Sequence, residues 1–361
     1  MTATPEQRTP GQMPTEQPTP GQAIEEISPG SRVLLTGASG LLGRSVARRL
    51  VADGYDVTTL QRSASTVDGA REVRGSLTDP DAVAAAVAGQ DAIVHLAAKV
   101  SVSGDHRDFA AVNVDGTRTL LDAAEAAGVE HLLHVSSPSV AHAGSSLVGE
   151  PAGDPDPARA AGSYAQTKAE AEQLVAARAA GGLKTLILRP HLVWGPGDGQ
   201  LTRRIVDRAR SGRLPLIGSG AALVDTLYID NAVEAFAAGL RRLPQIHGSR
   251  LVLTTGEPRP IGELMMGIAA AGGAPRPRLR ITPGLARAAG SAVEKAWALS
   301  ERIAGPHDDE PPMTRFLAEQ LSTAHWFDQR TTRRALDWTP SVTIDEGLRR
   351  LAEHVARTGG V

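Results

Sequence analysis

A tyrosine and a lysine with a helical spacing are the first residues of this chain that suggest chemistry. The segment GSYAQTKAEAE places Tyr164 four positions before Lys168, in a chain with only three tyrosines and, against thirty-four arginines, only four lysines. Residues four apart share one face of a helix. A free phenol has a pKa near 10, so it exchanges protons near neutral pH only if its phenolate is stabilised, as an adjacent ammonium would do. The pair therefore predicts a proton donor with its supporting charge; the alternative is a chance pairing on an exposed helix.

Three glycines form a second group with chemical meaning. In VLLTGASGLLGRSV, the residues Gly37, Gly40 and Gly43 stand between a short apolar run and an amphipathic stretch. Glycine there allows a tight turn and a close approach of backbone N–H groups to a pyrophosphate, and the following helix N-terminus favours the anion. The spacing G-x-x-G-x-x-G differs from the common G-x-G-x-x-G fingerprint. We interpret the segment as a dinucleotide-binding loop; the alternative is a turn that merely connects a strand to a helix.

The end of the second predicted strand bears on the choice of cofactor. A carboxylate about twenty residues after the loop would hydrogen-bond the ribose of NAD, but TTLQRS offers Gln61 and Arg62 instead. No acid there repels a 2′-phosphate, and Arg62 can pair with one. The sequence therefore favours NADP, with NAD as the alternative cofactor; the competing interpretation is that Arg62 is a solvated surface cation.

Short aliphatic runs that alternate with helix-forming stretches must position these groups. RVLLTG, DVTTL, AIVHLAA, HLLHVSS and TLILRP are too short for typical helices and are rich in Val, Leu and Ile. Strands buried on both faces that alternate with helices indicate an α/β fold with a doubly wound parallel sheet. The predicted helices between them span residues 41–52, 80–87, 109–127 and 163–180.

Composition divides the chain into three predicted parts. Residues 1–30 are rich in Pro, Thr, Gln and Gly and repeat TPGQ, which predicts a disordered tail. Residues 31–193 hold the alternating pattern and form the predicted NAD(P)-binding domain. Residues 194–361 form the predicted substrate-binding domain, with strands at 223–228 and 250–253 and helices at 202–211, 230–240 and 344–356.

Six motifs together resemble the extended short-chain dehydrogenase/reductase family, also known as the NAD-dependent epimerase/dehydratase family. They are TGASGLLG, HLAAKV, NVDGT, VSSPSVA, YAQTK and RPHLVWGPGD. The ending HWFDQRTTRRALDWTPSVTIDEGLRRLAEHV looks most like the branch with 3β-hydroxysteroid dehydrogenases, sterol 4-carboxylate dehydrogenases and bacterial 2-alkyl-3-oxoalkanoate reductases. The resemblance implies a Rossmann-type doubly wound parallel sheet with a smaller C-terminal α/β substrate domain.

The resemblance also implies roles for individual residues. Ser137 would hydrogen-bond the substrate oxygen, Tyr164 would protonate it, and Lys168 would hold the nicotinamide ribose; Ser137 could instead satisfy only the backbone at a strand end. Asn113 would anchor a water in the proton path from a kinked helix, or serve as a structural amide. Lys99 would face the nicotinamide or the substrate, or lie in solvent. Expected cofactor contacts are Gly37, Ser39, Gly40, Leu41, Leu42, Arg62, Ser76, Leu77, Ala97, Lys99, Tyr164, Lys168, Pro190 and Val193.

The chain departs from the family pattern at two places, one that bears on the adenine contact and one that bears on the type of reaction. An aspartate that often holds the adenine amino group is replaced by Ser76. Sugar-nucleotide dehydratases of the family carry an Asp-Glu pair after the catalytic serine, where this chain has Pro138 and Ser139. Neither residue can act as acid or base, which argues against a dehydratase.

The resemblance and one amphipathic stretch indicate an apolar substrate. We expect an NAD(P)(H)-dependent oxidoreductase that interconverts a ketone and a secondary alcohol on a steroid or a long-chain 3-oxo acid. A nucleotide-sugar epimerase or reductase is the alternative. A non-catalytic dinucleotide sensor is less favoured, because sensing does not need Ser137, Tyr164 and Lys168 together. The segment GLARAAGSAVEKAWALSERI would cover the substrate cleft, contact a membrane weakly or pack on the core, through a stripe of Leu285, Ala289, Ala292, Val293, Ala296, Trp297 and Ile303.

Bulk composition limits the other partners. A formal net charge of -2 and a pI near 6.6 give no electrostatic reason to expect nucleic acid. The chain has no cysteine, which excludes disulfides and thiolate metal sites, and its scattered histidines predict no metal site. Without a signal peptide or a bilayer-spanning run, we expect a cytoplasmic protein that binds a small molecule and lacks an integral membrane anchor. A homodimer is usual for the family that the chain resembles.

Overall fold

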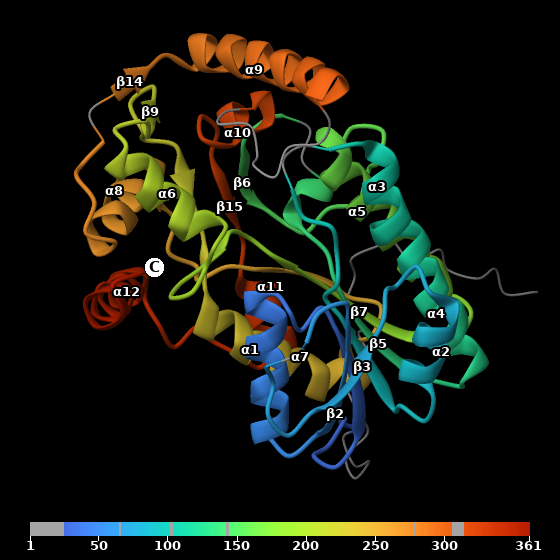
Figure 1. Cartoon of the computed structure of the whole chain (residues 1–361). Coiled ribbons are helices and arrows are strands. Elements are labelled where there is room, and N and C mark those ends of the chain that lie inside the picture. The colour runs from blue at the N-terminus through green and yellow to red at the C-terminus, as the bar shows by residue number, and fades with distance from the viewer. Residues whose placement is uncertain (1–24, 65, 102–103, 142–143, 278, 305–313) are drawn as a thin grey trace, which may run out of the picture.

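A seven-stranded parallel sheet forms the centre of the computed structural model, which describes residues 25–361 except 65, 102–103, 142–143, 278 and 305–313 (Figure 1). The strand order is β12-β7-β5-β4-β1-β2-β3, and all neighbouring pairs are parallel. The predicted Rossmann-type doubly wound sheet is therefore confirmed. The strands are β1 Arg32–Thr36, β2 Asp56–Gln61, β3 Arg71–Arg74, β4 Ala92–His95, β5 His131–Val135, β7 Lys184–Pro190 and β12 Arg250–Leu253.

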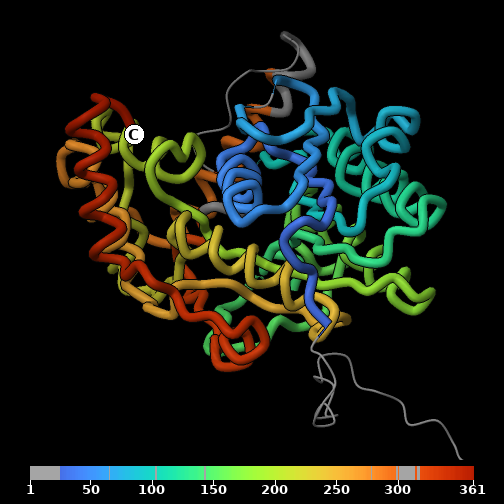
Figure 2. Tube along the Cα trace, turned by 90° about the horizontal axis from the view of Figure 1, so that it is seen from below, coloured from blue at the N-terminus to red at the C-terminus, as the bar shows by residue number. Residues whose placement is uncertain are grey.

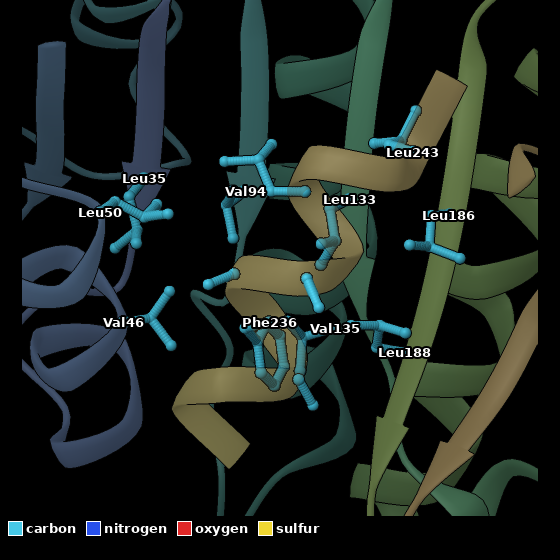
Figure 3. Packing of buried hydrophobic residues seen from close by; sticks show 14 of the residues in the cluster. Leu35, Val46, Leu50, Val94, Leu133, Val135, Leu186, Leu188, Phe236 and Leu243 are labelled. Atoms are coloured by element: carbon cyan, nitrogen blue, oxygen red, sulfur yellow. The ribbon is translucent and has the colours of Figure 1, made fainter. Parts of the chain in front are cut away.

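Helices cover both faces of this sheet, because successive residues of a strand point to opposite sides. Leu35 packs in one apolar cluster with α1, α7 and α11, whereas Leu34 packs in another with α2, α4 and α5. Figure 3 shows α7 crossing the strands, with Phe236 among the strand side chains. The helices are α1 Leu41–Ala52, α7 Ile229–Ile246 and α11 Arg330–Leu336 on one face, and α2 Pro80–Val87, α4 Gly116–Ala126 and α5 Gly162–Ala179 on the other.

The helix expected at residues 109–127 contains a change of hydrogen-bond pattern. Helix α3 (His106–Ala110) continues into α4 through a π-helical segment, η1 (Ala111–Asp115). Such π turns are rare in proteins as a whole, and those that occur often lie at functional sites. This one carries Asn113.

The expected domain boundary at residue 193 does not separate the sheet from the rest of the chain. β12, α7 and α11 all follow that residue, yet they complete the sheet and cover it. The chain leaves this layer and returns to it, so the smaller region is formed by several separate segments. In the described ranges these are β6 Leu147–Glu150, β8 Val193–Trp194, α6 Leu201–Arg210, β9 Pro215–Ile217, β10 Leu223–Val224, β11 Leu227–Tyr228, β13 Arg259–Pro260, α8 Ile261–Ala271, β14 Leu279–Ile281, α9 Pro283–Ala304, α10 Arg315–Gln320, β15 His325–Phe327 and α12 Ile344–Thr358.

The strand expected at residues 223–228 is broken into β10 and β11 by a buried acid. The carboxylate of Asp225 accepts hydrogen bonds from Thr254 Oγ1 (2.8 Å) and from the N–H groups of Gly256 (3.2 Å) and Glu257 (3.3 Å). Burial nevertheless raises the pKa of Asp225 to about 6. A polar anchor inside an apolar run therefore explains why one predicted strand is two.

Of the predicted tail, residues 1–30, the first 24 lie outside the described residues. Its last residues pack on the domain instead of forming a tail. The N–H of Ile27 donates to the carbonyl of Arg241 (3.0 Å), and its carbonyl accepts a hydrogen bond from the Tyr55 hydroxyl (2.8 Å). Figure 2 shows this dark-blue segment beside the yellow end of α7. A single buried apolar side chain, Ile27, thus extends the folded part toward the N-terminus.

The expected apolar stripe lies on α9 and is divided between two faces of the helix. Leu285 is 59% exposed, and Ala289, Ala292 and Ala296 are exposed with it, whereas Val293 and Trp297 are partly buried. The side chain of Ile303 is outside the described part. Figure 1 shows α9 along the outer edge of the molecule, beside α10. Among the described helices, none is long and apolar enough to cross a bilayer.

Candidate active site

Ser137 lies just beyond the carboxyl end of β5, where a short 3-10 helix begins. Its oxygen accepts hydrogen bonds from the hydroxyl (2.9 Å) and the N–H (3.3 Å) of Ser139. Because that oxygen already accepts two bonds, the hydroxyl hydrogen of Ser137 is left to be donated elsewhere. Ser139 was not among the expected site residues; its position two residues after Ser137, across a turn, is the signal that could have identified it.

Tyr164 lies in the first turn of α5 and reaches Ser137. Burial raises the pKa of its phenol to about 12, and a hydrogen bond with the Ser137 side chain acts in the opposite direction. At neutral pH the phenol is therefore protonated, which is the state that can donate a proton to an alkoxide.

Lys168 follows one turn later, and its side chain is only 4% exposed. Its Nζ donates a hydrogen bond to the carbonyl of Val135, the last residue of β5, at 2.5 Å. Burial lowers the pKa of Lys168 to about 8, and the Glu172 carboxylate opposes this shift. The structure thus brings Ser137, Tyr164 and Lys168 together at the carboxyl end of β5.

Asn113 fixes the loop after β4 to the helix that carries Tyr164. Its Oδ1 accepts a hydrogen bond from the N–H of Lys99 (2.7 Å), while its Nδ2 donates to the carbonyl of Lys99 (3.2 Å) and to Thr167 Oγ1 (3.1 Å). Both hydrogens of the amide and one lone pair of its oxygen are therefore used by protein partners. This geometry corresponds to the structural-amide alternative for the side chain of Asn113, and it joins two site elements.

The glycine loop lies where the strand order reverses, between β1 and β4. A Cβ added to Gly37 would come within 2.8 Å of the nitrogen of Ala97, and one added to Gly43 within 2.2 Å of the oxygen of Gly37. At Gly40, the N-cap of α1, the nearest atom would be 3.7 Å away, and no side chain caps the helix. The loop is tight against the protein and open at the helix N-terminus, so it fits the pyrophosphate of a dinucleotide.

The other expected cofactor residues lie at the carboxyl ends of parallel strands and so share one edge of the sheet. Arg62 is exposed directly after β2, whereas Gln61 is buried and neither atom of its amide has a hydrogen-bond partner among the described residues. The Ser76 hydroxyl is paired with that of Thr78 (2.8 Å). These residues are Ser39, Leu41 and Leu42 after β1, Arg62 after β2, Ser76 and Leu77 after β3, Ala97 and Lys99 after β4, and Pro190 and Val193 at and after the end of β7.

A buried ion pair behind Lys168 was not expected from the sequence. Glu172 and Arg189 are both 0% exposed and form a two-pronged contact, with Nη2–Oε1 at 2.6 Å and Nε–Oε2 at 3.0 Å. Arg250 adds a third contact to Glu172, with Nε–Oε1 at 3.2 Å. The sequence holds one sign of this ion pair, a spacing of four residues that places Tyr164, Lys168 and Glu172 on one face of α5.

A phenol one helical turn before an ammonium, at the carboxyl edge of the sheet that also carries the glycine loop, has the chemistry needed to exchange a proton with an alcohol or a ketone. The chain is an NAD(P)-dependent oxidoreductase that acts on CH–OH groups. Its residues 33–252 match the NAD dependent epimerase/dehydratase family, and the chain belongs to that family. The predicted resemblance to extended short-chain dehydrogenases/reductases is thereby confirmed.

Curated relatives agree with this assignment, and a solved structure agrees with the fold. The chain is 42% identical over 328 residues to the 2-alkyl-3-oxoalkanoate reductase of Stenotrophomonas maltophilia, covering 89% of this chain and 98% of that one. It is 30% identical over 334 residues to the 3 beta-hydroxysteroid dehydrogenase/Delta 5-->4-isomerase of Mycobacterium tuberculosis, covering 88% of each. The fold is similar to that of MoeE5 in complex with UDP-glucose and NAD, with a TM-score of 0.70 at 22% identity, covering 92% of this chain and 100% of that one.

Proposed function

We propose that the chain reduces long-chain 2-alkyl-3-oxo acids with NADPH as the reductant. The observation that carries the proposal is the joining of Ser137, Tyr164 and Lys168 at the end of β5. The identity of 42% to a 2-alkyl-3-oxoalkanoate reductase, over nearly its whole length, supports the substrate class. Pro138 and Ser139 leave no acid–base pair for a dehydration.

In this proposal the substrate carbonyl oxygen accepts hydrogen bonds from Ser137 and Tyr164. A bound nicotinamide supplies the hydride to the carbonyl carbon. Tyr164 gives its proton to the oxygen as the hydride arrives, and the ammonium of Lys168 stabilises the phenolate that remains. Both effects act on charge that develops only during the reaction, which is what accelerates it.

NADP is the proposed cofactor because of the end of β2. Arg62 is an exposed cation there, and Gln61 presents a buried amide where a ribose-binding acid would exclude a phosphate. A guanidinium binds a phosphate through two parallel hydrogen bonds.

We assign Lys99 to the carboxylate of the substrate. Its backbone is fixed by Asn113, and its ammonium contacts the Asp108 carboxylate (2.8 Å) and the Phe109 ring (5.2 Å to the centroid). The pair is partly exposed and hence weak, so a substrate carboxylate can replace Asp108 at little cost. We expect Lys99→Met to lower kcat/KM for a 3-oxo acid about tenfold while a neutral ketone reacts as before, because only the acid loses an ionic partner. An equal loss on both substrates would contradict this assignment.

The proposed function is tested with a panel of substrates, whose turnover is measured through the absorbance of NADPH or NADH. The panel holds a long-chain 2-alkyl-3-oxo acid, a 3-oxo steroid and a UDP-sugar, and denatured protein is analysed for retained cofactor. Oxidation of NADPH by the oxo acid is the expected result. Turnover of the UDP-sugar without added reductant, together with tightly held NAD, would instead indicate an epimerase.

A further inference from the structure

A continuous chain of hydrogen bonds runs beneath the candidate active site through a buried histidine. The Ala97 N–H donates to Thr36 Oγ1 (3.1 Å), which lies 2.7 Å from His95 Nδ1. On the other side of the ring, His95 Nε2 lies 3.0 Å from Thr117 Oγ1, which donates to the carbonyl of Asn113 (2.6 Å). Thr36, His95, Thr117 and Asn113 are each at most 1% exposed.

The direction of every bond in this chain follows from its ends. The single hydroxyl hydrogen of Thr117 goes to a carbonyl, so toward His95 this hydroxyl can only accept, and Nε2 must carry a proton. Burial and the nearby charge of Lys168 lower the pKa of His95 to about 3, so the ring is neutral and Nδ1 is an acceptor. The Thr36 hydroxyl therefore donates to Nδ1 while it accepts from Ala97.

This chain of hydrogen bonds connects the cofactor loop with the helix that carries Tyr164. Thr36 directly precedes Gly37, whose turn lies against Ala97. At the other end, Asn113 holds both Lys99 and Thr167, the latter within the turn of α5 that begins at Tyr164. His95 thus joins the cofactor loop to the proton donor across two strands and two helices.

The histidine beside it on the next strand provides a contrast. His134 pairs in register with His95, its ring centroid lies 5.3 Å away, and it is 0% exposed. Neither of its ring nitrogens has a hydrogen-bond partner within the described part of the chain. Two buried imidazoles therefore share one environment, but only His95 is bonded at both nitrogens.

We propose that His95, as a neutral imidazole with its proton on Nε2, is a positioning residue that couples the cofactor loop to the helices of the active site. It touches neither substrate nor cofactor and acts through Thr36 and Thr117. The kinetic part of this proposal rests on the proposed reductase function; the tautomer does not.

Two substitutions break this chain of hydrogen bonds, each on one side of the His95 ring. In His95→Asn the amide oxygen replaces Nδ1 and keeps the bond from Thr36, whereas in His95→Gln the amide nitrogen replaces Nε2 and keeps the bond to Thr117. We expect His95→Asn to lower kcat about tenfold with the cofactor KM little changed, and His95→Gln to raise the cofactor KM about tenfold with kcat little changed. His134→Leu, the matched control, should leave both constants within about threefold of the original. Equal changes in kcat and KM for the two His95 variants would reduce His95 to a core residue.

Nitrogen NMR of the ligand-free, ¹⁵N-histidine-labelled protein provides a test that needs no substrate. The His95 signals are those that vanish in His95→Gln. We expect one protonated and one unprotonated ring nitrogen, with the proton on Nε2, unchanged between about pH 5 and 8, even though Lys168 and His134 face the ring. A ring protonated on Nδ1, or one that titrates in this range, would overturn the proposal whatever the substrate proves to be. If the NMR result holds but no oxo acid is reduced, the proposed function fails alone, and titration of NADPH into His95→Gln still measures the coupling to the loop.

Discussion

The carboxyl edge of the central sheet and the outer edge formed by α9 use their side chains in opposite ways. At the sheet edge, polar groups such as Asn113, His95 and Glu172 are buried and bonded on several sides. Along α9, the apolar Leu285 is exposed, and the inward contact is made by the small Ala286. Buried polar groups that are bonded on several sides lose these bonds when a partner is changed, whereas the exposed side chains of α9 can be solvated by water instead. Substitutions should therefore be costly at the first region and mild at the second.

The largest expected effect is the loss of the Tyr164 hydroxyl. Tyr164→Phe removes the proton donor and should lower kcat by about 10² to 10⁴, because general acid catalysis contributes that much. Tyr55→Phe is the matched control, since it also removes a buried hydroxyl, one bonded to the carbonyl of Ile27 (2.8 Å). Steady-state reduction, followed by NADPH absorbance, measures both. Comparable activity of the two variants would mean that Tyr164 is not the acid.

The buried ion pair offers the next largest effect. Glu172→Gln removes the carboxylate that pairs with the buried Arg189, whereas Arg250 keeps its contact with Asp154 (2.7 Å). An uncompensated buried charge such as that of Arg189 costs about 3 to 5 kcal/mol in the free energy of unfolding. Glu346→Gln is the control on the surface, where the carboxylate contacts Arg349 (2.6 Å) and Arg350 (2.7 Å) but water can replace both. Urea unfolding should separate the two variants clearly. Similar midpoints would mean that the sheet edge is no more tightly constrained than the surface.

The parts of this site that the sequence predicts are those with a local signature. Tyr164 and Lys168 are one helical turn apart, and Gly37, Gly40 and Gly43 lie within a single loop, so spacing alone brings them together. Strand periodicity likewise predicts the parallel sheet and its layers.

What the sequence does not predict is set by contacts between distant segments. Glu172 meets Arg250, and His95 meets Thr36 and Thr117, across separations that no local pattern encodes. Strand β12 likewise returns to the sheet after a long excursion, which no local pattern encodes. Asp225 broke a predicted strand because its partners at residues 254–257 come from another part of the chain.

Cofactor choice should respond to a single exposed residue at the sheet edge. Arg62→Ala should raise the KM for NADPH about tenfold to a hundredfold, because a hydrogen bond to a charged group contributes about 1.5 to 3 kcal/mol. The KM for NADH, which lacks the 2′-phosphate, should stay unchanged, and Arg62→Lys should lie between. Parallel titrations of the two cofactors measure the ratio. Equal changes for NADPH and NADH would remove Arg62 from phosphate recognition.

The smallest effect is expected on the exposed face of α9, and it sharpens the contrast with the sheet edge. Leu285→Ser should change the free energy of unfolding by less than about 0.5 kcal/mol, because exposed substitutions away from special features rarely cost more. Its inward neighbour Ala286 packs with Ile217 and Ala318, so Ala286→Leu should cost about 1 to 3 kcal/mol through overpacking. Urea unfolding at two protein concentrations measures both. A large, concentration-dependent loss for Leu285→Ser would mean that a second copy covers this face in solution, and that α9 is constrained by assembly as the sheet edge is constrained by chemistry.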